Sequence, residues 1–323
     1  MCTAITYKTH AHYFGRNLDW EHSFGEEIVI TPRKYPLKFK KAADISWHYA
    51  MIGAALRYEE YPLYFDAVNE KGLAAAGLNF PKNAHYKPYF EGFDNITPFE
   101  FIPYILSKCQ SVSDARKLLS RMNIVDISFS DTLPLTPLHW IIADKNSSIT
   151  VEPSKSGVNI YENEVGVLTN NPPFDMQLFY LSNFLNLTSS EPVNRFTDRI
   201  TIKPCSRGLG AYSLPGDLSS PSRFVKAAFT KLNSPSDLSE DVSISQFFHI
   251  LSSAEQQCGT VKIGDKYEKT IYSSCCNTDK GIYYYKTYNN SRINAVSLEG
   301  ENLEGEKLIS HPFLCGQDIN FQN

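Results

Sequence analysis

The second residue of the chain, Cys2, would combine two reactive groups on one residue if Met1 were removed. A thiol attacks a carbonyl carbon as the thiolate, and a free α-amine with a reference pKa of about 7.7–8.0 can accept the thiol proton near neutral pH. Such a pair supports nucleophilic catalysis without a histidine. Initiator methionine is generally removed when the next residue is as small as Cys. A small thiol with no catalytic role fits the same start.

Arg16 and Asp19 follow Cys2 at a spacing that could return them to its side. Residues 3–7 and 12–16 have the composition of two short strands joined by a polar turn, which predicts a hairpin. That hairpin would place the Arg16–Asp19 stretch beside Cys2. There a carboxylate can hold a protonated amine, and a guanidinium can lower the thiol pKa or neutralise a leaving carboxylate. The alternative is an Arg–Asp pair at a surface turn.

Three further polar residues stand in contexts that suit catalysis as well as ordinary structure. Asn79 follows the small residues AAAGL, which favour close approach of backbone to a ligand, but tight packing or a turn explains them too. An amide donor aimed at a developing oxyanion contributes about 3–4 kcal/mol in a comparable site. Asn170 and Asn171 precede Pro172, an arrangement also typical of a strand-ending turn. Arg223 stands in the first turn of a predicted helix, against the macrodipole, which indicates a tertiary or catalytic partner, although a solvated side chain would lose little there.

The strands and helices that must position these residues are grouped in separate blocks along the chain. Periodic apolar residues and cap signals, with Ser220 as a cap, predict helices over residues 97–109, 111–123, 219–233 and 243–256. Alternating or β-branched runs predict further strands over residues 28–33, 61–70, 72–80, 138–144, 149–154, 157–163, 165–171, 270–276, 281–288 and 293–299. Strands, then helices, then strands again, without βαβα alternation, predict an α+β fold with largely antiparallel sheets.

The chain offers no linker that clearly divides it, so we expect one domain over residues 1–323. The segment 172–220 is rich in Pro, Ser, Asn and Gly, and it is the least regular part of the sequence. Long segments of this kind are uncommon inside compact domains. We therefore interpret residues 172–220 as an excursion or an assembly element.

Composition and charge narrow the class of protein. The net charge of −4, with both signs interspersed, argues against a nucleic-acid partner, and no uncharged apolar run of about 18 residues predicts a membrane span. The start of the chain does not have the pattern of a signal peptide. Seven irregularly spaced cysteines then indicate reduced thiols and a cytoplasmic location, with Cys275 and Cys276 as buried free thiols rather than a vicinal disulfide or metal site. The eight scattered His, without HExxH or CxxC, predict no metal site.

Five short motifs in order resemble the choloylglycine hydrolase family: Cys2, FGRNLD at 14–19, GLNFP at 77–81, GVLTNNP at 166–172 and SRF at 222–224. The stretches NEKGL, LPGDLSS, QFFHIL and KGIYYY also look like this family, so the resemblance covers essentially the whole chain. The family contains the conjugated bile acid hydrolases and the penicillin V acylases, within the N-terminal nucleophile (Ntn) hydrolases. The resemblance implies a four-layer αββα sandwich built on two packed, mainly antiparallel sheets.

The resemblance also implies a role for each of the six polar residues. Cys2 would be the nucleophile and its freed amine the base, with Arg16 and Asp19 beside it. Asn79 would help to form the oxyanion hole, and Asn170 would donate to the same hole or contact the α-amine. Asn170 is preferred to its neighbour because the family motif reads T-N-x-P. Arg223 would complete the set, and no metal or organic cofactor would be needed.

For the substrate, the resemblance implies a glycine- or taurine-conjugated bile acid and a homotetrameric enzyme. Asn79 is typical of the bile-salt branch, whereas penicillin V acylases usually carry Tyr there. Residues with aromatic or aliphatic side chains near turns are candidate walls of an amphipathic pocket: Trp20, Phe24, Tyr58, Tyr61, Phe65, Phe129, Leu133 and Leu135. Each of these side chains could instead cover the core. Penicillin V acylase activity and a non-catalytic binder of apolar carboxylates are the alternatives.

Overall fold

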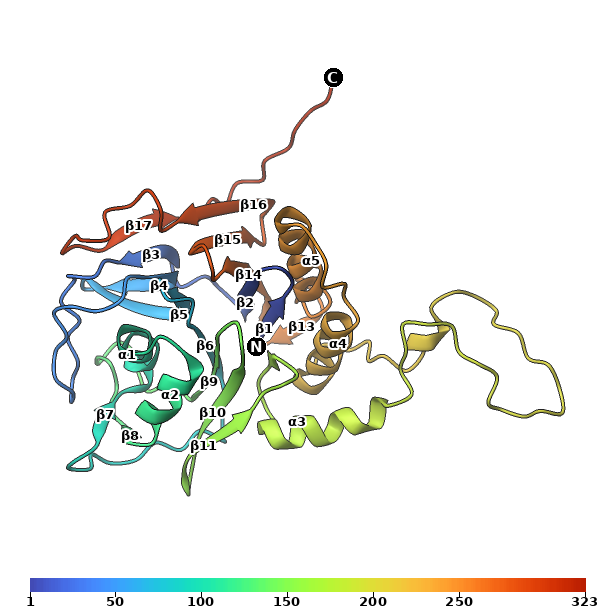
Figure 1. Cartoon of the computed structure of the whole chain (residues 1–323), viewed down its shortest axis with the longest axis horizontal. Helices are drawn as coiled ribbons and strands as arrows, with labels where there is room; N and C mark the ends of the chain where they lie inside the picture. Colours follow the sequence, from blue (N-terminus) through green and yellow to red (C-terminus); the bar gives the residue numbers. More distant parts are fainter.

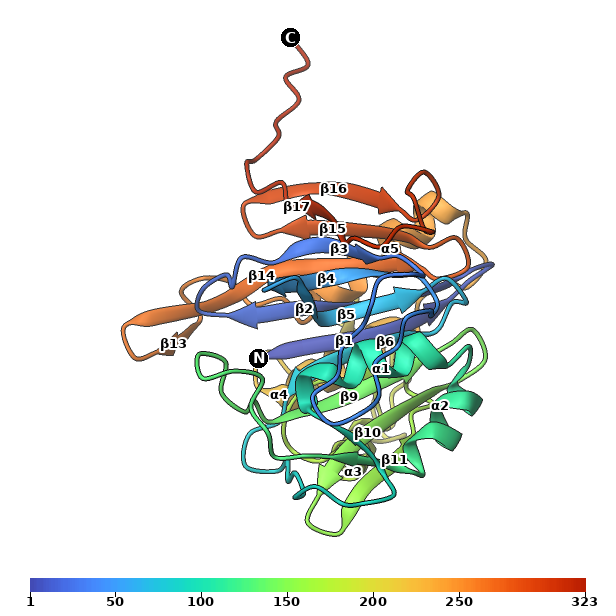
Figure 2. The ribbon, with the colours of Figure 1, turned by 90° about the vertical axis from the view of Figure 1, so that its left-hand side faces the viewer.

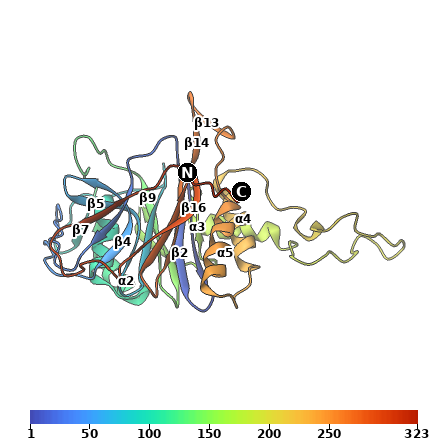
Figure 3. The same cartoon turned by 90° about the horizontal axis from the view of Figure 1, so that it is seen from above.

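Two large β-sheets lie face to face in the computed structural model, which describes residues 1–323 (Figure 1). Helices cover the outer face of each sheet, so the order of layers is helix, sheet, sheet, helix (Figure 3). The predicted α+β class and the four-layer αββα sandwich are confirmed.

The first sheet has seven strands and is built around the N-terminal hairpin. Its spatial order is β12-β1-β2-β14-β15-β16, with β13 paired to β14, and every pairing is antiparallel. The strands are β1 (Cys2–Lys8), β2 (His12–Trp20), β12 (Val167–Leu168), β13 (Val261–Ile263), β14 (Lys266–Asn277), β15 (Ile282–Thr287) and β16 (Asn290–Ser297). The predicted hairpin is therefore present, at the centre of the sheet.

The second sheet has eight antiparallel strands, in the order β11-β10-β9-β6-β5-β4-β3-β17 (Figure 2). They are β3 (Glu27–Thr31), β4 (Met51–Tyr58), β5 (Tyr61–Asn69), β6 (Ala74–Asn79), β9 (Leu138–Ala143), β10 (Ser148–Ser154), β11 (Gly157–Glu162) and β17 (Ile309–Pro312). The only parallel pairing joins two short strands, β7 (Asp94–Ile96) and β8 (Met122–Ile124). The strands that begin and end the chain thus belong to different sheets.

The helices pack on the two outer faces. They are α1 (Phe101–Lys108), α2 (Val112–Leu119), α3 (Phe174–Leu181), α4 (Ser220–Leu232) and α5 (Glu240–Ser252), with short 3₁₀ turns at Pro98–Glu100, Ser182–Phe184 and Leu209–Ala211. Helices α4 and α5 contact β1, β2 and β14 of the first sheet, and α1 contacts β5 and β6 of the second. This arrangement buries β1 on both faces, which explains its nearly continuous burial.

The core between the sheets is mainly apolar, but it contains the buried carboxylate of Asp66. Apolar residues from both sheets, such as Ile5 and Ile52, belong to one cluster. Among them Asp66 of β5 accepts hydrogen bonds from the hydroxyls of Tyr272 (2.5 Å), Tyr283 (2.6 Å) and Ser274 (3.0 Å) on the facing sheet. Burial raises the pKa of this carboxyl, although Arg16 and the hydroxyls oppose the shift. Asp66 therefore links the two sheets through a fully partnered polar cluster.

Several element boundaries differ from the predictions. Residues 122 and 123, predicted as the end of a helix, belong instead to β8, because that strand pairs with β7. The helix predicted from residue 243 starts at Glu240, and the cap of α4 is Ser219 rather than Ser220, which lies inside the helix. The segment predicted as irregular contains α3. Its apolar residues do not gather on one face, since Met176 and Phe179 are exposed, so its sequence lacks the usual helical stripe.

Candidate active site

The hairpin β1–β2 places the nucleophile candidate opposite its charged neighbours. Cys2 is the first residue of β1 and pairs with Leu18 of β2, so Arg16 and Asp19 lie on the return strand beside it. Gly15, which directly precedes Arg16, is required by packing, because a Cβ there would overlap the carbonyl of Ser274 on β14. The glycine of FGRNLD thus allows β2 and β14 to approach each other at the site.

The guanidinium of Arg223 connects three groups around Cys2. Nη1 donates to the carbonyl oxygen of Cys2 and to Oγ1 of Thr3 (2.6 Å), and Nη2 donates to Oδ1 of Asn170 (2.8 Å). The side chain is fully buried, and this burial lowers the pKa of Arg223, while Asp19 opposes the shift. Because a guanidinium is planar and has several fixed donors, it holds these groups in one geometry.

Asn170 contacts the nitrogen atom on which the chemistry of the N-terminus depends. Its Oδ1 accepts the N–H of Cys2 at 2.8 Å, and its Nδ2 donates to the carbonyl oxygen of Asn79 at 2.7 Å. Asn170 thereby joins β1 to the end of β6. Asn79 itself is half-buried, and no hydrogen bond within the chain engages its side-chain amide. Asn170 thus uses its side-chain amide within the protein, whereas the N–H donors of the Asn79 side chain are free.

Asp19 lies buried beside the N-terminus. Its Oδ1 accepts a hydrogen bond from Thr270 Oγ1 (2.6 Å), and its Oδ2 has no hydrogen-bond partner and lies 3.9 Å from Nη1 of Arg223. Burial raises the pKa of the Asp19 carboxyl, and the attraction of Arg223 and the N-terminal ammonium partly offsets this rise. A carboxylate in this position can stabilise a cation at the N-terminus.

Arg16 keeps one free donor inside the protein. Its Nη1 donates to the carbonyl oxygens of Phe65 (3.0 Å) and Gly77 (2.5 Å), whereas its Nη2 is buried without a partner. Burial alone would lower the pKa of Arg16, but the neighbouring acidic groups Cys2, Tyr272 and Asp66 keep it above its ordinary value. A buried cationic donor without a partner suits a negatively charged or strongly polarised oxygen or sulfur.

The structure contains Met1, so the nitrogen of Cys2 is part of a peptide bond. The ammonium of Met1 donates to the carbonyl oxygen of Asp19 at 2.8 Å and to the carboxylate of Glu268. Burial lowers the pKa of this ammonium. An amide nitrogen is not a base, so Cys2 acquires its own amine only when Met1 is removed.

The predicted site residues therefore fall into one connected group, which also contains residues that were not predicted. Hydrogen bonds connect Cys2, Asn170, Arg223 and Asn79, and Asp19 and Arg16 follow from the hairpin register. The missed residues are Thr3, Ser220, Glu268 and Thr270. Thr3 could have been found from its place next to Cys2 and Ser220 from the stretch LPGDLSS, but Glu268 and Thr270 come from a distant segment without a motif.

The predicted pocket residues form two aromatic groups. Trp20, Phe24 and Phe65 lie close together, with ring centroids 5.7 Å apart for Trp20–Phe24 and 5.8 Å for Phe24–Phe65. This group adjoins the site, because the carbonyl oxygen of Phe65 is bound by Arg16. In the other group, Phe129 contacts Tyr58 and Tyr61, with ring centroids 5.8 Å and 5.3 Å apart.

The aliphatic pocket candidates belong to the loop of the second group. Leu133 and Leu135 are half-buried, and the loop is held by a hydrogen bond from the hydroxyl of Tyr58 or of Thr132, 2.9 Å apart. This bond ties the loop to Tyr58, at the end of β4.

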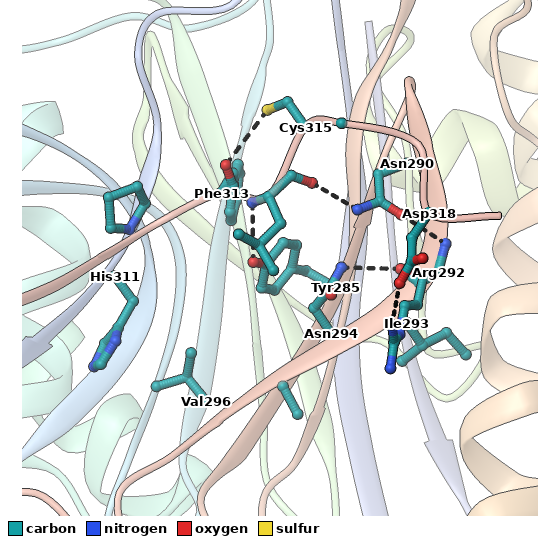
Figure 4. Close-up of a pocket in the computed structure, with 14 residues that line it drawn as sticks. Tyr285, Asn290, Arg292, Ile293, Asn294, Val296, His311, Phe313, Cys315 and Asp318 are labelled. Carbon is teal, nitrogen blue, oxygen red and sulfur yellow. Dashed lines mark hydrogen bonds and ion pairs between the residues drawn. The ribbon is translucent and has the colours of Figure 1, made fainter. Parts of the chain in front are cut away.

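A cavity of about 970 Å³ opens elsewhere, between β15, β16 and the C-terminal segment (Figure 4). Its lining includes Cys315 and His311 but none of the six predicted site residues. The thiol of Cys315 is directed to the carbonyl oxygen of Phe313 (3.6 Å), and the His311 ring is bound to Glu301 (2.9 Å). The two side chains are thus engaged separately, and they do not form a nucleophile–base pair.

No group of three or more His, Cys, Asp or Glu side chains is arranged to hold a metal ion. All seven cysteines are free, and Cys275 and Cys276 are buried, as predicted. Burial raises the pKa of both of these thiols well above the ordinary value, so they are poor nucleophiles. No helix has the length and apolar character needed to cross a membrane.

Comparison with known proteins agrees with this geometry. Residues 2–311 match the model of the linear amide C–N hydrolases, choloylglycine hydrolase family. The chain is 56% identical over 313 residues to a bile salt hydrolase/transferase of Lactiplantibacillus plantarum, covering 97% of each protein.

Two solved structures are similar as well. A mutant of the conjugated bile acid hydrolase from Clostridium perfringens superposes with a TM-score of 0.93 at 35% identity, over 100% of both chains. The penicillin V acylase from Agrobacterium tumefaciens superposes with a TM-score of 0.75 over 96% of this chain and 90% of that one. At 20% identity, this last likeness shows a shared fold.

Proposed function

The chain belongs to the choloylglycine hydrolase family of linear amide C–N hydrolases, and on that premise we propose that it hydrolyses the amide bond of glycine- or taurine-conjugated bile acids. The observation that carries the proposal is the bond between the nitrogen of Cys2 and Oδ1 of Asn170, with Arg223 bound to both residues. This contact orients the nitrogen that becomes the α-amine once Met1 is removed.

The first half of the reaction forms a thioester. The Cys2 amine accepts the thiol proton, and the thiolate attacks the scissile carbonyl carbon, which places a negative charge on its oxygen. The free amide of Asn79 donates to this oxyanion. The ammonium then gives its proton to the leaving nitrogen, so that glycine or taurine departs as the amine and the bile acid remains bound to sulfur.

In the second half, water replaces the amine at the same carbon. The Cys2 amine accepts a proton from the water, the C–S bond breaks, and the bile acid leaves as a carboxylic acid that ionises. Asp19 stabilises the ammonium form of the amine, and the Nη2 group of Arg16 is available to the thiolate or to an oxygen of the substrate. Arg223 and Asn170 keep the N-terminal residue in place during both steps.

The relatives support the choice of substrate, and the aromatic groups supply a suitable surface. The names of the similar proteins refer to bile salts and conjugated bile acids. A steroid is large, rigid and apolar, and aromatic side chains bury such surfaces well. The group Trp20, Phe24 and Phe65 adjoins Arg16, so we assign it to the wall nearest the reacting bond, and the group around Phe129 to a more distant wall.

A second reaction follows from the same intermediate. The relative in Lactiplantibacillus plantarum is named a hydrolase and a transferase. A thioester can react with an amine in place of water, and this would return an amide and regenerate the thiol. We therefore propose acyl transfer to amino acids as an accompanying activity.

The decisive experiment measures the intact mass of the purified protein and its rates of hydrolysis on three substrates. Purified protein should have the intact mass of the chain without Met1 and should hydrolyse glycocholate or taurocholate faster than penicillin V. Cys2→Ala should lower kcat at least 1,000-fold, whereas Cys205→Ala, at an exposed thiol, should not. Faster hydrolysis of penicillin V would favour the acylase alternative, and ligand binding without turnover would favour a binding protein. Active protein that retains Met1 would contradict the mechanism.

Three further properties belong to the same proposal. We assign one domain to residues 1–323, supported by the family match over residues 2–311. The seven free cysteines support a cytoplasmic location. We assign the chain to a homotetramer assembled through the excursion within residues 172–220, because that segment exposes large apolar side chains.

A further inference from the structure

A buried histidine–glutamate pair lies between the two segments that carry Asn79 and Asn170. His139 belongs to β9, which pairs with β6 in the second sheet, and Glu152 belongs to β10, on the other side of β9 (Figure 2). Their side chains are 0% and 3% exposed, and Nδ1 of His139 lies 3.1 Å from Oε1 of Glu152. The mechanism given above uses neither residue, so the role of this buried polar pair has to be sought in its contacts.

One side of the histidine ring is bound to the segment of Asn170. Nε2 of His139 lies 2.8 Å from the carbonyl oxygen of Thr169, the residue before Asn170. The N–H of Asn170, in the same peptide group, donates to Ser220 Oγ (2.8 Å), and the carbonyl oxygen of Asn170, in the next peptide group, accepts from Gln177 Nε2 (2.7 Å). The backbone on both sides of Asn170 is therefore fixed, and His139 supplies one of the three bonds.

The face of the same ring contacts the segment of Asn79. Phe80 stacks on His139 with ring centroids 4.2 Å apart and an angle of 6° between the planes. Phe80 is buried and directly follows Asn79 at the end of β6. A displacement of the ring would therefore move the residues adjacent to both Asn79 and Asn170.

The hydrogen-bond partners of His139 and Glu152 determine how many protons the pair carries. A carbonyl oxygen only accepts, so Nε2 of His139 must carry a proton toward Thr169. The contact between Nδ1 and Glu152 then needs one more proton, from an imidazolium or from a carboxylic acid, and in both forms the pair is neutral overall. Oε1 of Glu152 also accepts the N–H of Phe174, the first residue of α3. Glu152 thus sets the orientation of the ring.

We propose that His139 and Glu152 are positioning residues for the two amides of the site. His139 sets the separation of Asn79 and Asn170, and Glu152 holds the ring in the required orientation. This inference rests on the proposed amide hydrolysis, because only that reaction gives the amides their catalytic task. Displacing a catalytic group by about 1 Å can lower a rate about 100-fold without direct contact to the substrate.

The test compares apolar and conservative replacements in the protein lacking Met1, with glycocholate and taurocholate as substrates. His139→Leu and Glu152→Leu should each lower kcat by 10- to 100-fold while KM changes by less than about threefold. Glu152→Gln keeps the size of the side chain and an oxygen in the place of Oε1, which accepts the N–H of Phe174 and, from an imidazolium, the Nδ1–H of His139. It should therefore retain at least about threefold more kcat than Glu152→Leu.

His12 provides a matched control. It is also buried, and its ring contacts two hydroxyls, Thr6 Oγ1 (2.5 Å) and Thr278 Oγ1 (2.8 Å), at the turn end of the hairpin. His12→Leu should lower the melting temperature and leave kcat unchanged. The inference is overturned if His139→Leu behaves in the same way. It is also overturned if Glu152→Gln loses as much kcat as Glu152→Leu, a comparison that remains available if the His139 variant does not fold. An inactive wild type would instead refute the proposed function itself.

Discussion

At the scale of single residues, Arg223 has the most demanding geometry. One guanidinium binds the carbonyl oxygen of Cys2, the hydroxyl of Thr3 and the side chain of Asn170. A lysine ammonium carries the same charge but has no fixed fork, so it cannot reach all three acceptors in this geometry. Replacing Arg223 by Lys would therefore keep the positive charge but remove the planar fork of donors.

Arg223→Lys should lower kcat for a conjugated bile acid about 100-fold, because the N-terminal residue loses its fixed position while the charge remains. KM should change by less than about threefold. Steady-state rates measure both quantities, and Arg292→Lys, at an exposed ion pair with Asp318, serves as the control. Wild-type kcat in Arg223→Lys would show that only the charge of this residue is needed.

The residues of the site differ in how far the sequence predicts them. Arg16 and Asp19 were placed beside Cys2 correctly, because a short hairpin fixes its own register. Asn79 and Asn170 depended on a resemblance, since each also suits a turn. Glu268, which holds the ammonium of Met1, was missed. It lies on β14 more than 260 positions from Met1, and no local pattern distinguishes a carboxylate that a distant strand will bury.

At the scale of the elements, the hairpin β1–β2 carries a pH-sensitive group at its turn. Burial lowers the pKa of His12 from 6.5 to about 4, despite the opposing effect of Asp279. The folded state therefore disfavours the protonated form. Stability is complete above pH 6.5 and is lost as the pH falls toward 4, because the unfolded chain binds the proton first.

We expect His12 to remove about 2 kcal/mol from the free energy of unfolding between pH 7.5 and pH 4.5. His12→Gln removes the titrating group, so the difference in stability between wild type and variant should shrink by this amount over that range. Urea denaturation at the two pH values measures it. His10→Gln, at an exposed histidine bound to exposed Asp237, should keep the wild-type pH dependence. Equal slopes for wild type and His12→Gln would contradict the assignment.

Most elements were predictable where local pattern and tertiary packing agree. Helix α4 follows its apolar stripe, and α1 follows its continuous apolar run onto the second sheet. The predicted boundaries are wrong where tertiary packing, and not the local pattern, determines which element forms. Strand β14 starts four residues before the predicted strand, at Lys266, because β13 pairs with that end. Residues 122 and 123, predicted as helical, instead belong to the pairing of β8 with β7, which no window of the sequence could reveal.

At the scale of the whole molecule, the strand order was not predictable from the residues alone. Sequential hairpins explain β4–β5–β6 and β9–β10–β11, but β6 pairs with β9 across more than 50 residues and β14 pairs with β2 across more than 240. Loop-closure entropy rises so slowly with length that sequence separation alone does not select among such pairings. The two-sheet arrangement therefore came from the resemblance, and the structure confirms it.

The whole molecule also has one prominent feature that its own core does not explain. The chain between α3 and α4 projects far from the sheets (Figure 1). Leu185, Val193, Phe196 and Tyr212 of this segment are all at least 77% exposed. Burying one such side chain contributes about 1.5–3 kcal/mol, and exposed apolar groups that gather on one segment indicate a protein interface. A second copy of the chain is the partner proposed above.

Replacing both Phe196 and Tyr212 by Glu should therefore dissociate the assembly while leaving each chain folded, because neither side chain contributes to the core. Light scattering coupled to size exclusion should give about four times 36.6 kDa for the wild type and a smaller mass for the variant. Trp47→Glu, at an exposed aromatic residue outside the excursion, should retain the wild-type mass. A wild type of 36.6 kDa, or a double variant that keeps the full mass, would contradict assembly through this segment. Circular dichroism of the double variant must match the wild type, since a charge on an exposed excursion has no core contact to disturb.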